Sequence, residues 1–150
     1  MKLLKLEILN LASLDKPSGE VIDFEAGVLK NCTIFSIVGP MGSGKSTLLD
    51  AICLALYSRA PRYPRKKGER KSIEIYGEPE EGEKNRLAPT DCRNILTQGK
   101  KHGYSKLTFL ANNGDLYRAE WHVEFKAKKY ADPITELYKI TVENGEPVET

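Results

Sequence analysis

The sequence predicts an α/β fold in which a buried strand leads through a glycine-rich loop into a helix. Residues 33–38 (TIFSIV) are almost continuously apolar and β-branched, as expected of a central strand that is covered on both faces. From Lys45 to Tyr57 the apolar residues recur with the period of a helix, and their stripe is wide enough to predict a mostly buried one. Residues 103–142 alternate between apolar and polar positions, which predicts antiparallel strands.

The remaining elements follow from shorter patterns. Leu4, Leu6 and Ile8 alternate with charged residues, which predicts a half-buried opening strand, and Ile22 and Phe24 repeat this signal. Residues 58–102 carry little periodicity and much proline, glycine and charge, so we expect a long irregular region with at most a short strand near 73–76. The chain is thus expected to form one lobe with three parts, 1–57, 58–102 and 103–144.

The antiparallel part is predicted as a hairpin with one wet side, followed by a third strand. A turn is expected at 112–115 (NNGD). Alternate residues after the turn, from Tyr117 to Phe125, form the apolar face, and the intervening charged residues form the other. Residues 134–142 are predicted to form the third strand. Trp121, on the apolar face, is expected in the core rather than as a platform for a nucleic-acid base.

The amino-acid composition limits the partners and the cellular compartment that we expect for the protein. The formal net charge is +2, with 23 basic and 21 acidic residues, so overall charge favours no partner class. The three cysteines include no CxxC pair, which fits a reducing compartment. The apolar runs are far shorter than the roughly 20 residues of a membrane-spanning helix. We therefore expect a soluble, cytoplasmic protein with no membrane partner.

The loop between the expected strand and helix matches the pattern GxxxxGK[ST], which binds the phosphates of nucleotides. The sequence GPMGSGKS at 39–46 has the strand before it and the helix after it that this motif requires. Glycine is needed because successive backbone N–H groups must point inward around a phosphate, and side chains at Gly42 or Gly44 would hinder that approach. The alternative is a glycine-rich turn with an incidental lysine, but strand, spacing and helix together favour nucleotide binding.

Each side chain of the motif has an expected role. Lys45 stabilises charge on the β- and γ-phosphates and is the candidate catalytic residue, the Ser46 hydroxyl can ligate Mg²⁺, and Thr47 can hold the α-phosphate. ATP and Mg²⁺ are the expected cofactors. The nine candidate binding positions are Gly39, Pro40, Met41, Gly42, Ser43, Gly44, Lys45, Ser46 and Thr47.

Hydrolysis requires a second element that the sequence lacks. A P-loop ATPase also uses a carboxylate at the end of another buried strand to hold the metal and polarise water. No run of four apolar residues followed by Asp or Glu occurs after the loop, and no LSGG-like stretch is present. We therefore expect this chain to be the front part of a larger ATPase head.

Four stretches resemble the N-terminal part of the SbcC family, the SMC-like, ABC-type ATPase subunits of bacterial SbcCD exonucleases. They are KLLKLEILNLASL at 2–14, STLLDAICLALYSRAPR at 46–62, TDCRNILTQGK at 90–100 and YSKLTFLANNGDLYRAEWHVEFKA at 104–127. The resemblance spans most of the chain and is weakest at 62–86 and after about residue 130. It implies an ABC/SMC-type head that is incomplete without a C-terminal lobe of the same polypeptide, joined through a coiled coil with a zinc-binding CxxC at its apex.

The resemblance also implies function and partners. ATP would lie between two copies of the head, and its binding and hydrolysis would gate an SbcD-like nuclease subunit that acts on double-stranded DNA in repair and recombination; the isolated chain would be inactive. Asn10 and Ser13 fall where the family's first loop approaches the nucleotide, and Thr97 and Gln98 fall in the segment that runs past the adenine. Ala12 stands where some relatives have Arg or Asn, which removes a side-chain contact there. The other ATPase motifs would lie beyond Thr150.

Further charged groups have simpler explanations. Seven basic residues between Arg59 and Lys71 could touch DNA phosphates, but a solvated loop is favoured because the acidic run 78–83 follows it. Asp50 is interpreted as making a polar contact within its helix rather than binding a metal. His102 and His122 have no cysteine or histidine neighbours for zinc, so both are expected on the surface.

Two other classes of function remain open from the residues alone. One is a small P-loop kinase that acts on a metabolite, which would need an acceptor-binding lid and a base in this chain. The other is a non-catalytic interaction module that responds to nucleotide binding.

Overall fold

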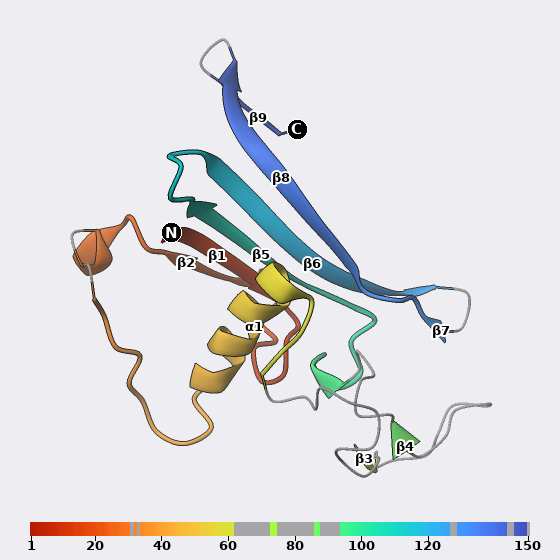
Figure 1. Ribbon diagram of the computed structural model, residues 1–150. Coiled ribbons are helices and arrows are strands. Elements are labelled where there is room, and N and C mark those ends of the chain that lie inside the picture. The colour runs from red at the N-terminus through yellow and green to blue at the C-terminus, as the bar shows by residue number, and fades with distance from the viewer. Residues whose placement is uncertain are drawn as a thin grey trace.

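The computed structural model describes residues 1–30, 32, 34–61, 73–74, 86–87, 94–126, 129–143 and 146–149. A twisted antiparallel sheet with strand order β2-β1-β5-β6-β8-β9 forms its body, and β7 pairs with β6 beside this path. The helix α1 crosses one face of the sheet (Figure 1). The elements in chain order are β1 Lys2–Leu9, β2 Glu20–Asp23, the 3₁₀ helix η1 Gly27–Leu29, α1 Lys45–Tyr57, β3 Ile73–Glu74, β4 Arg86–Leu87, β5 His102–Leu110, β6 Leu116–Lys126, β7 Lys129–Tyr130, β8 Ile134–Glu143 and β9 Glu146–Glu149.

The opening strand and the hairpin form as predicted. β1 pairs with β2 and with β5, so the first strand of the chain lies between two strands that are about 80 residues apart in the sequence. β5 pairs over its whole length with β6 around the turn at 111–115, with Leu110 opposite Leu116 and His102 opposite Glu124. The third predicted strand is β8, which pairs with β6. The short strand expected near 73–76 is β3.

The core lies between the sheet and α1. Alternate residues of β1, β5 and β6 face the helix and are buried, and Leu6, Leu107 and Trp121 are among the largest fully buried side chains. Trp121 is 2% exposed, which confirms its predicted place in the core. Ser105 is fully buried at the same interface, and its hydroxyl donates a hydrogen bond of 2.8 Å to the carbonyl oxygen of Ala51. This bond ties the middle of α1 to β5.

Two left-handed residues bound the helix α1. Gly44, with φ of +86°, precedes the first turn, and Ser58, with φ of +57°, follows the last and donates its N–H to the carbonyl oxygen of Leu54 at 2.9 Å. Such a residue after the last turn is a common way to end a helix. One face of α1 is buried, but Leu49 is 55% and Tyr57 is 69% exposed. The helix is therefore covered on one side rather than mostly buried.

The prediction of a buried central strand at 33–38 is wrong for the part of this segment that the structure describes. Residues 34–38 belong to no strand, and Ile34 and Val38 are 89% and 84% exposed. Phe35 packs against Phe24, with ring centroids 5.5 Å apart, and is still 43% exposed. The segment has the composition of a central strand, but among the described residues no strand lies beside it to accept its backbone hydrogen bonds.

Candidate nucleotide-binding site

The loop that precedes α1 has the left-handed glycines and the following helix that the phosphate-binding motif requires, but the described residues before it, 34–38, do not form the expected strand. Gly42 and Gly44 have φ angles of +84° and +86°, which side chains strongly disfavour. At Gly39 a Cβ atom would lie 2.7 Å from the Ser43 hydroxyl oxygen. The shape of the loop therefore requires glycine at positions 42 and 44, whereas the Ser43 hydroxyl could rotate away from a side chain at position 39. The loop leads directly into the first turn of the helix, where unpaired N–H groups attract anions.

The ammonium group of Lys45 lies against the loop. Its Nζ donates hydrogen bonds to the carbonyl oxygens of Gly39 at 2.8 Å and Pro40 at 2.6 Å, and it lies 3.4 Å from the Ser43 hydroxyl. These acceptors hold the positive charge over the loop. An incoming phosphate would compete with neutral carbonyl groups for this ammonium, and hydrogen bonds between charged groups are the stronger ones.

A pocket with a volume of about 520 Å³ opens beside the loop, within the range of small-molecule sites. One wall is the loop itself and the first turn of α1. The other wall is Ala12 and Ser13, in the connection that follows β1. The structure thus brings Ser13 into one pocket with the loop, although the two segments are about thirty residues apart. The lining residues are Ala12, Ser13, Met41, Gly42, Ser43, Gly44, Lys45, Ser46 and Thr47.

The other candidate residues lie around this pocket rather than in its lining. Asn10 is 5% exposed, and its side-chain amide donates to the carbonyl oxygen of His102 at 2.9 Å. Thr97 donates from its hydroxyl to the carbonyl oxygen of Ala12 at 2.8 Å. Gln98 is exposed. Their assignment as nucleotide-binding residues stays a prediction, as does that of Gly39 and Pro40, which hold Lys45.

Asp50 and Cys53 lie on α1, away from the pocket lining. Asp50 is 1% exposed, on the buried face of the helix. Burial raises the pKa of the Cys53 thiol above its usual value of 9.0, and the nearby Asp50 carboxylate adds to this effect. A thiol with a raised pKa is a poor nucleophile, so Cys53 is not a candidate for covalent chemistry.

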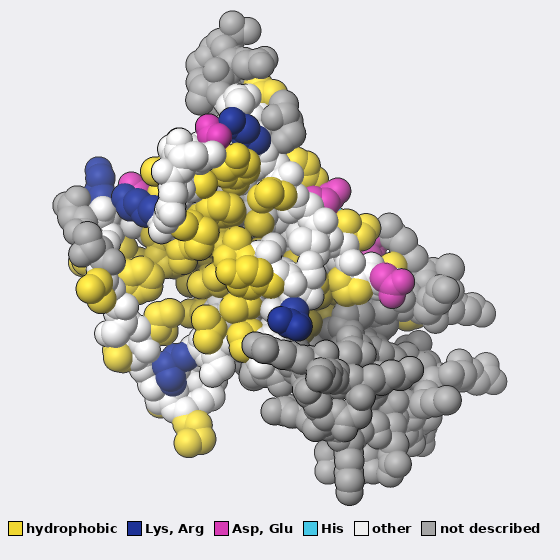
Figure 2. Space-filling model, in the orientation of Figure 1, with side chains coloured by type: hydrophobic (Ala, Val, Ile, Leu, Met, Phe, Trp, Pro, Cys, Tyr) yellow, Lys and Arg dark blue, Asp and Glu magenta, His cyan; other side chains and the backbone are white. Residues whose placement is uncertain are grey.

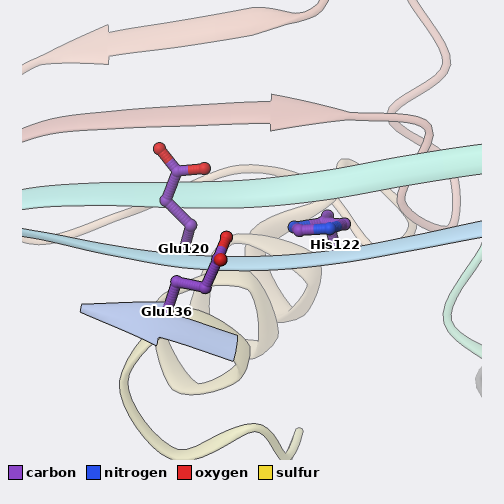
Figure 3. A group of neighbouring side chains, drawn as sticks. All are labelled: Glu120, His122 and Glu136. Atoms are coloured by element: carbon purple, nitrogen blue, oxygen red, sulfur yellow. The ribbon is translucent and has the colours of Figure 1, made fainter. Parts of the chain in front are cut away.

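A cluster of ionisable side chains on the opposite face of the sheet was not foreseen as a group. Glu120 and His122 of β6 and Glu136 of β8 have ligand atoms within 4.8 Å of one another (Figure 3). Glu120 lies directly opposite Glu136 in the register of the two strands. The pairing of β6 with β8 brings these side chains together. Once both strands are predicted, aligning them as neighbours would indicate this cluster.

Ion pairs within the sheet account for this cluster. Glu120 lies 3.2 Å from Lys106 Nζ and 2.5 Å from Arg118 Nε, so two cations already compensate its charge. Its side chain is only 8% exposed because these neighbours cover it, although the sequence placed it on the wet face. Glu136 accepts a hydrogen bond from Tyr138 and thereby raises the pKa of that phenol. A metal ion would have to displace these partners. His102 is exposed and His122 half-buried.

The basic segment 59–71 is described only at 59–61, so the expectation about DNA contacts lies outside the described residues. In the part of the chain that the structure describes, we find no helix with the length and hydrophobicity that a membrane span requires.

A sheet with a flanking helix and a P-loop at the start of that helix are features of a P-loop nucleotide-binding domain. Residues 5–147 match the AAA domain family, and the chain belongs to this family. Among curated proteins it is similar to the SbcC subunit of the nuclease SbcCD from Pseudomonas aeruginosa, with 40% identity over 122 residues, and to that from Rhodobacter capsulatus, with 36% identity over 121 residues. These matches confirm the resemblance to the SbcC family.

The matches cover most of this chain and little of the relatives. Each of the two SbcC proteins matches 81% of the chain, which spans 9% of their length. A probable DNA double-strand break repair Rad50 ATPase of Aquifex aeolicus is 44% identical over 63 residues, which are 42% of the chain and 6% of that protein.

Proposed function

We propose that this chain is the ATP-binding N-terminal lobe of an ABC/SMC-type head, in the ATPase subunit of a DNA-repair nuclease complex. The pocket carries the proposal, because residues 41–47 of the P-loop line it, with Gly42 and Gly44 in the left-handed conformation and Lys45 held by carbonyl oxygens of the loop. The names of the relatives, which mention the nuclease SbcCD and a Rad50 ATPase, support the choice of complex. Division into 1–57, 58–102 and 103–144 is part of this proposal.

In this role the loop binds the phosphates and Lys45 neutralises them. Backbone N–H groups from Gly42 to Thr47 orient the phosphate chain, and Lys45 exchanges its carbonyl partners for phosphate oxygens. Ser46 fits a magnesium ion, since it carries a hydroxyl oxygen, is exposed in the first helical turn and is one of the residues that line the pocket. When bound, Mg²⁺ offsets the negative charge of the phosphates.

The exposed apolar surface supports a second lobe of the same polypeptide. Hydrophobic side chains gather in a broad area on the face that carries α1 (Figure 2). Ile34, Val38 and Leu49 are more than half exposed on or near this helix and its loop. Broad contiguous apolar areas on a protein surface commonly mark interaction sites. We propose that the C-terminal lobe covers it and supplies the carboxylate for hydrolysis, so that the chain alone binds ATP without turnover.

The remaining partners are proposed from the relatives. Two heads would enclose ATP between them, and hydrolysis would gate an SbcD-like nuclease on double-stranded DNA. Dimerisation that depends on ATP and is lost with Lys45→Ala would support this part, and sedimentation of the full polypeptide with and without ATP measures it.

Titration calorimetry of MgATP into the protein tests the binding proposal. Lys45→Ala removes a charge-assisted contact worth about 1.5–3 kcal/mol, so affinity should fall roughly 10- to 150-fold while the melting temperature stays unchanged. Lys16→Ala is the matched control, because Lys16 is an exposed lysine whose nearest partner, Glu20, lies 3.7 Å away. Equal binding by wild type and Lys45→Ala would refute the proposal.

A further inference from the structure

We propose that Thr97 is a positioning residue, which holds the Ala12–Ser13 wall of the pocket in place against the nucleoside part of a bound nucleotide. The inference rests on the proposed function, because it concerns the same pocket. It assigns Thr97 a role through Ala12 rather than a contact of its own with the adenine.

The backbone that leads into the wall, and that of Ala12 within it, adopts conformations that are unfavourable for residues other than glycine. Asn10 and Ala12 have φ angles of +53° and +48°, in the left-handed region that residues other than glycine rarely adopt. For Asn the penalty is small, but Ala gains nothing in return from its own side chain. Such conformations persist where the surrounding structure fixes them.

The segment 95–97 provides that support through three hydrogen bonds. The N–H of Ala12 donates to the carbonyl oxygen of Ile95 at 2.7 Å, and the N–H of Thr97 donates to the carbonyl oxygen of Asn10 at 2.9 Å. The third bond runs from the Thr97 hydroxyl to the carbonyl oxygen of Ala12 at 2.8 Å. Both polar backbone groups of Ala12 are thereby held by one segment, and only the third bond depends on a side chain.

The position of the wall indicates which part of a nucleotide it meets. The loop wall supplies the backbone N–H groups and Lys45, which are the groups that bind phosphate. Ala12 and Ser13 carry no charge and line the rest of the pocket. With the phosphates on the loop, the ribose and base are what remains to lie against Ala12 and Ser13.

The wall also touches the loop, and this contact defines the competing explanation. A Cβ atom at Gly44 would lie 3.1 Å from Leu14 Cδ2 and 3.8 Å from the Ser13 hydroxyl oxygen. If the bond from Thr97 mainly kept the phosphate loop in shape, its loss would weaken every ligand that binds through phosphates. If it positions the wall, the loss concerns only ligands that carry a nucleoside.

Thr97→Val tests this distinction, because valine keeps the shape of threonine and removes the hydroxyl donor. Calorimetric titrations of the protein, as its gene encodes it, are made with MgATP and with magnesium tripolyphosphate, which has the phosphates without the nucleoside. We expect Thr97→Val to bind MgATP about 3- to 10-fold more weakly and tripolyphosphate as the wild type does. Thr97→Ser keeps the donor and should restore binding of MgATP.

Thr135→Val is the matched control, because it makes the same change at an exposed threonine of β8, whose hydroxyl lies 2.6 Å from Ser58 Oγ past the last turn of α1 and not in the pocket lining. It should bind both ligands like the wild type. Thr97→Ala serves as a second variant should valine prevent folding, which the fluorescence of the buried Trp121 reports. Unchanged MgATP binding by the folded variants overturns the inference, and so does an equal loss for both ligands. Failure of the wild type to bind either ligand instead refutes the proposed function.

Discussion

Gly103 is the point at which the sheet and the connection that carries the pocket wall come closest. A Cβ atom at this position would lie 2.5 Å from Leu96 Cδ2, 2.9 Å from the carbonyl oxygen of Leu9 and 3.2 Å from that of Asn10. The methyl end of Leu96 can rotate away, but the two carbonyl groups belong to β1 and its continuation. We therefore expect Gly103→Ala to push residues 9–12 away from β5.

The cost follows from the kind of contact. Extra atoms in a packed interior destabilise by about 1–3 kcal/mol, because neighbouring backbone must shift. For a domain of this size each kcal/mol lowers the melting temperature by about 2–4 °C, so Gly103→Ala should melt about 2–12 °C below the wild type. Differential scanning calorimetry of the chain measures this shift, and binding of MgATP should weaken in parallel.

A matched glycine separates crowding from backbone preference. At Gly114 an added Cβ would meet nothing within 4 Å, although its φ is +85°. Because asparagine adopts this left-handed conformation at little cost, Gly114→Asn should melt close to the wild type. If Gly103→Ala melts within about 1 °C of the wild type, the close approach of β5 to residues 9–12 does not constrain the fold and the reasoning is refuted.

Two further predictions concern single polar contacts. Lys139 Nζ lies 2.8 Å from Asp115 Oδ2, and this hydrogen bond is the main reason why the pKa of Asp115 falls below its ordinary 3.8. A carboxyl whose pKa is lowered on folding stabilises the fold above its unfolded pKa, and this stabilisation is lost as the pH falls through the folded value. Urea unfolding should therefore show Asp115→Asn as less stable than the wild type near about pH 6, with the difference closing below 3.8; a constant difference would contradict this. Ser105→Ala removes the bond to Ala51 and should lower the free energy of unfolding by about 0.5–1.5 kcal/mol, whereas an unchanged urea midpoint would show that this bond does not hold α1.

The parts of the fold that the sequence predicts well are those decided by local alternation. Apolar and polar residues alternate along β1, β5 and β6, and this alternation assigns each side chain to one face of the sheet. The face predicted to be buried is the buried one in all three strands, as Leu6, Leu107 and Trp121 show. Glu120 is the exception, because its burial comes from Lys106 and Arg118 on the same face rather than from the core. The order of the strands in the sheet places Lys106 of β5 beside Glu120 of β6. The alternation of residues within one strand does not reveal which side chains of the next strand lie beside it.

In the candidate site, too, the sequence predicts the part formed by consecutive residues but not the contacts between distant segments. The phosphate loop is a continuous stretch, so its residues and spacing could be read directly, and the left-handed angles at Gly42 and Gly44 agree with that interpretation. The link between Thr97 and Ala12 joins residues that are far apart in the chain. Resemblance placed Thr97 near the nucleotide, but only the structure shows that its hydroxyl is bonded to Ala12.

The exposed segment 34–38 shows what composition can and cannot predict. Its apolar, β-branched residues report the surroundings that the segment requires, namely neighbouring strands and cover on both faces. They do not say which part of a polypeptide provides these surroundings. In this structure β5 forms its backbone hydrogen bonds with β1 and β6, and Ile34 and Val38 remain exposed. A segment that has the composition of a central strand and yet lies open is what the proposed head requires, since its second lobe would bring the strands that pair with residues 34–38 and fix the start of the phosphate loop.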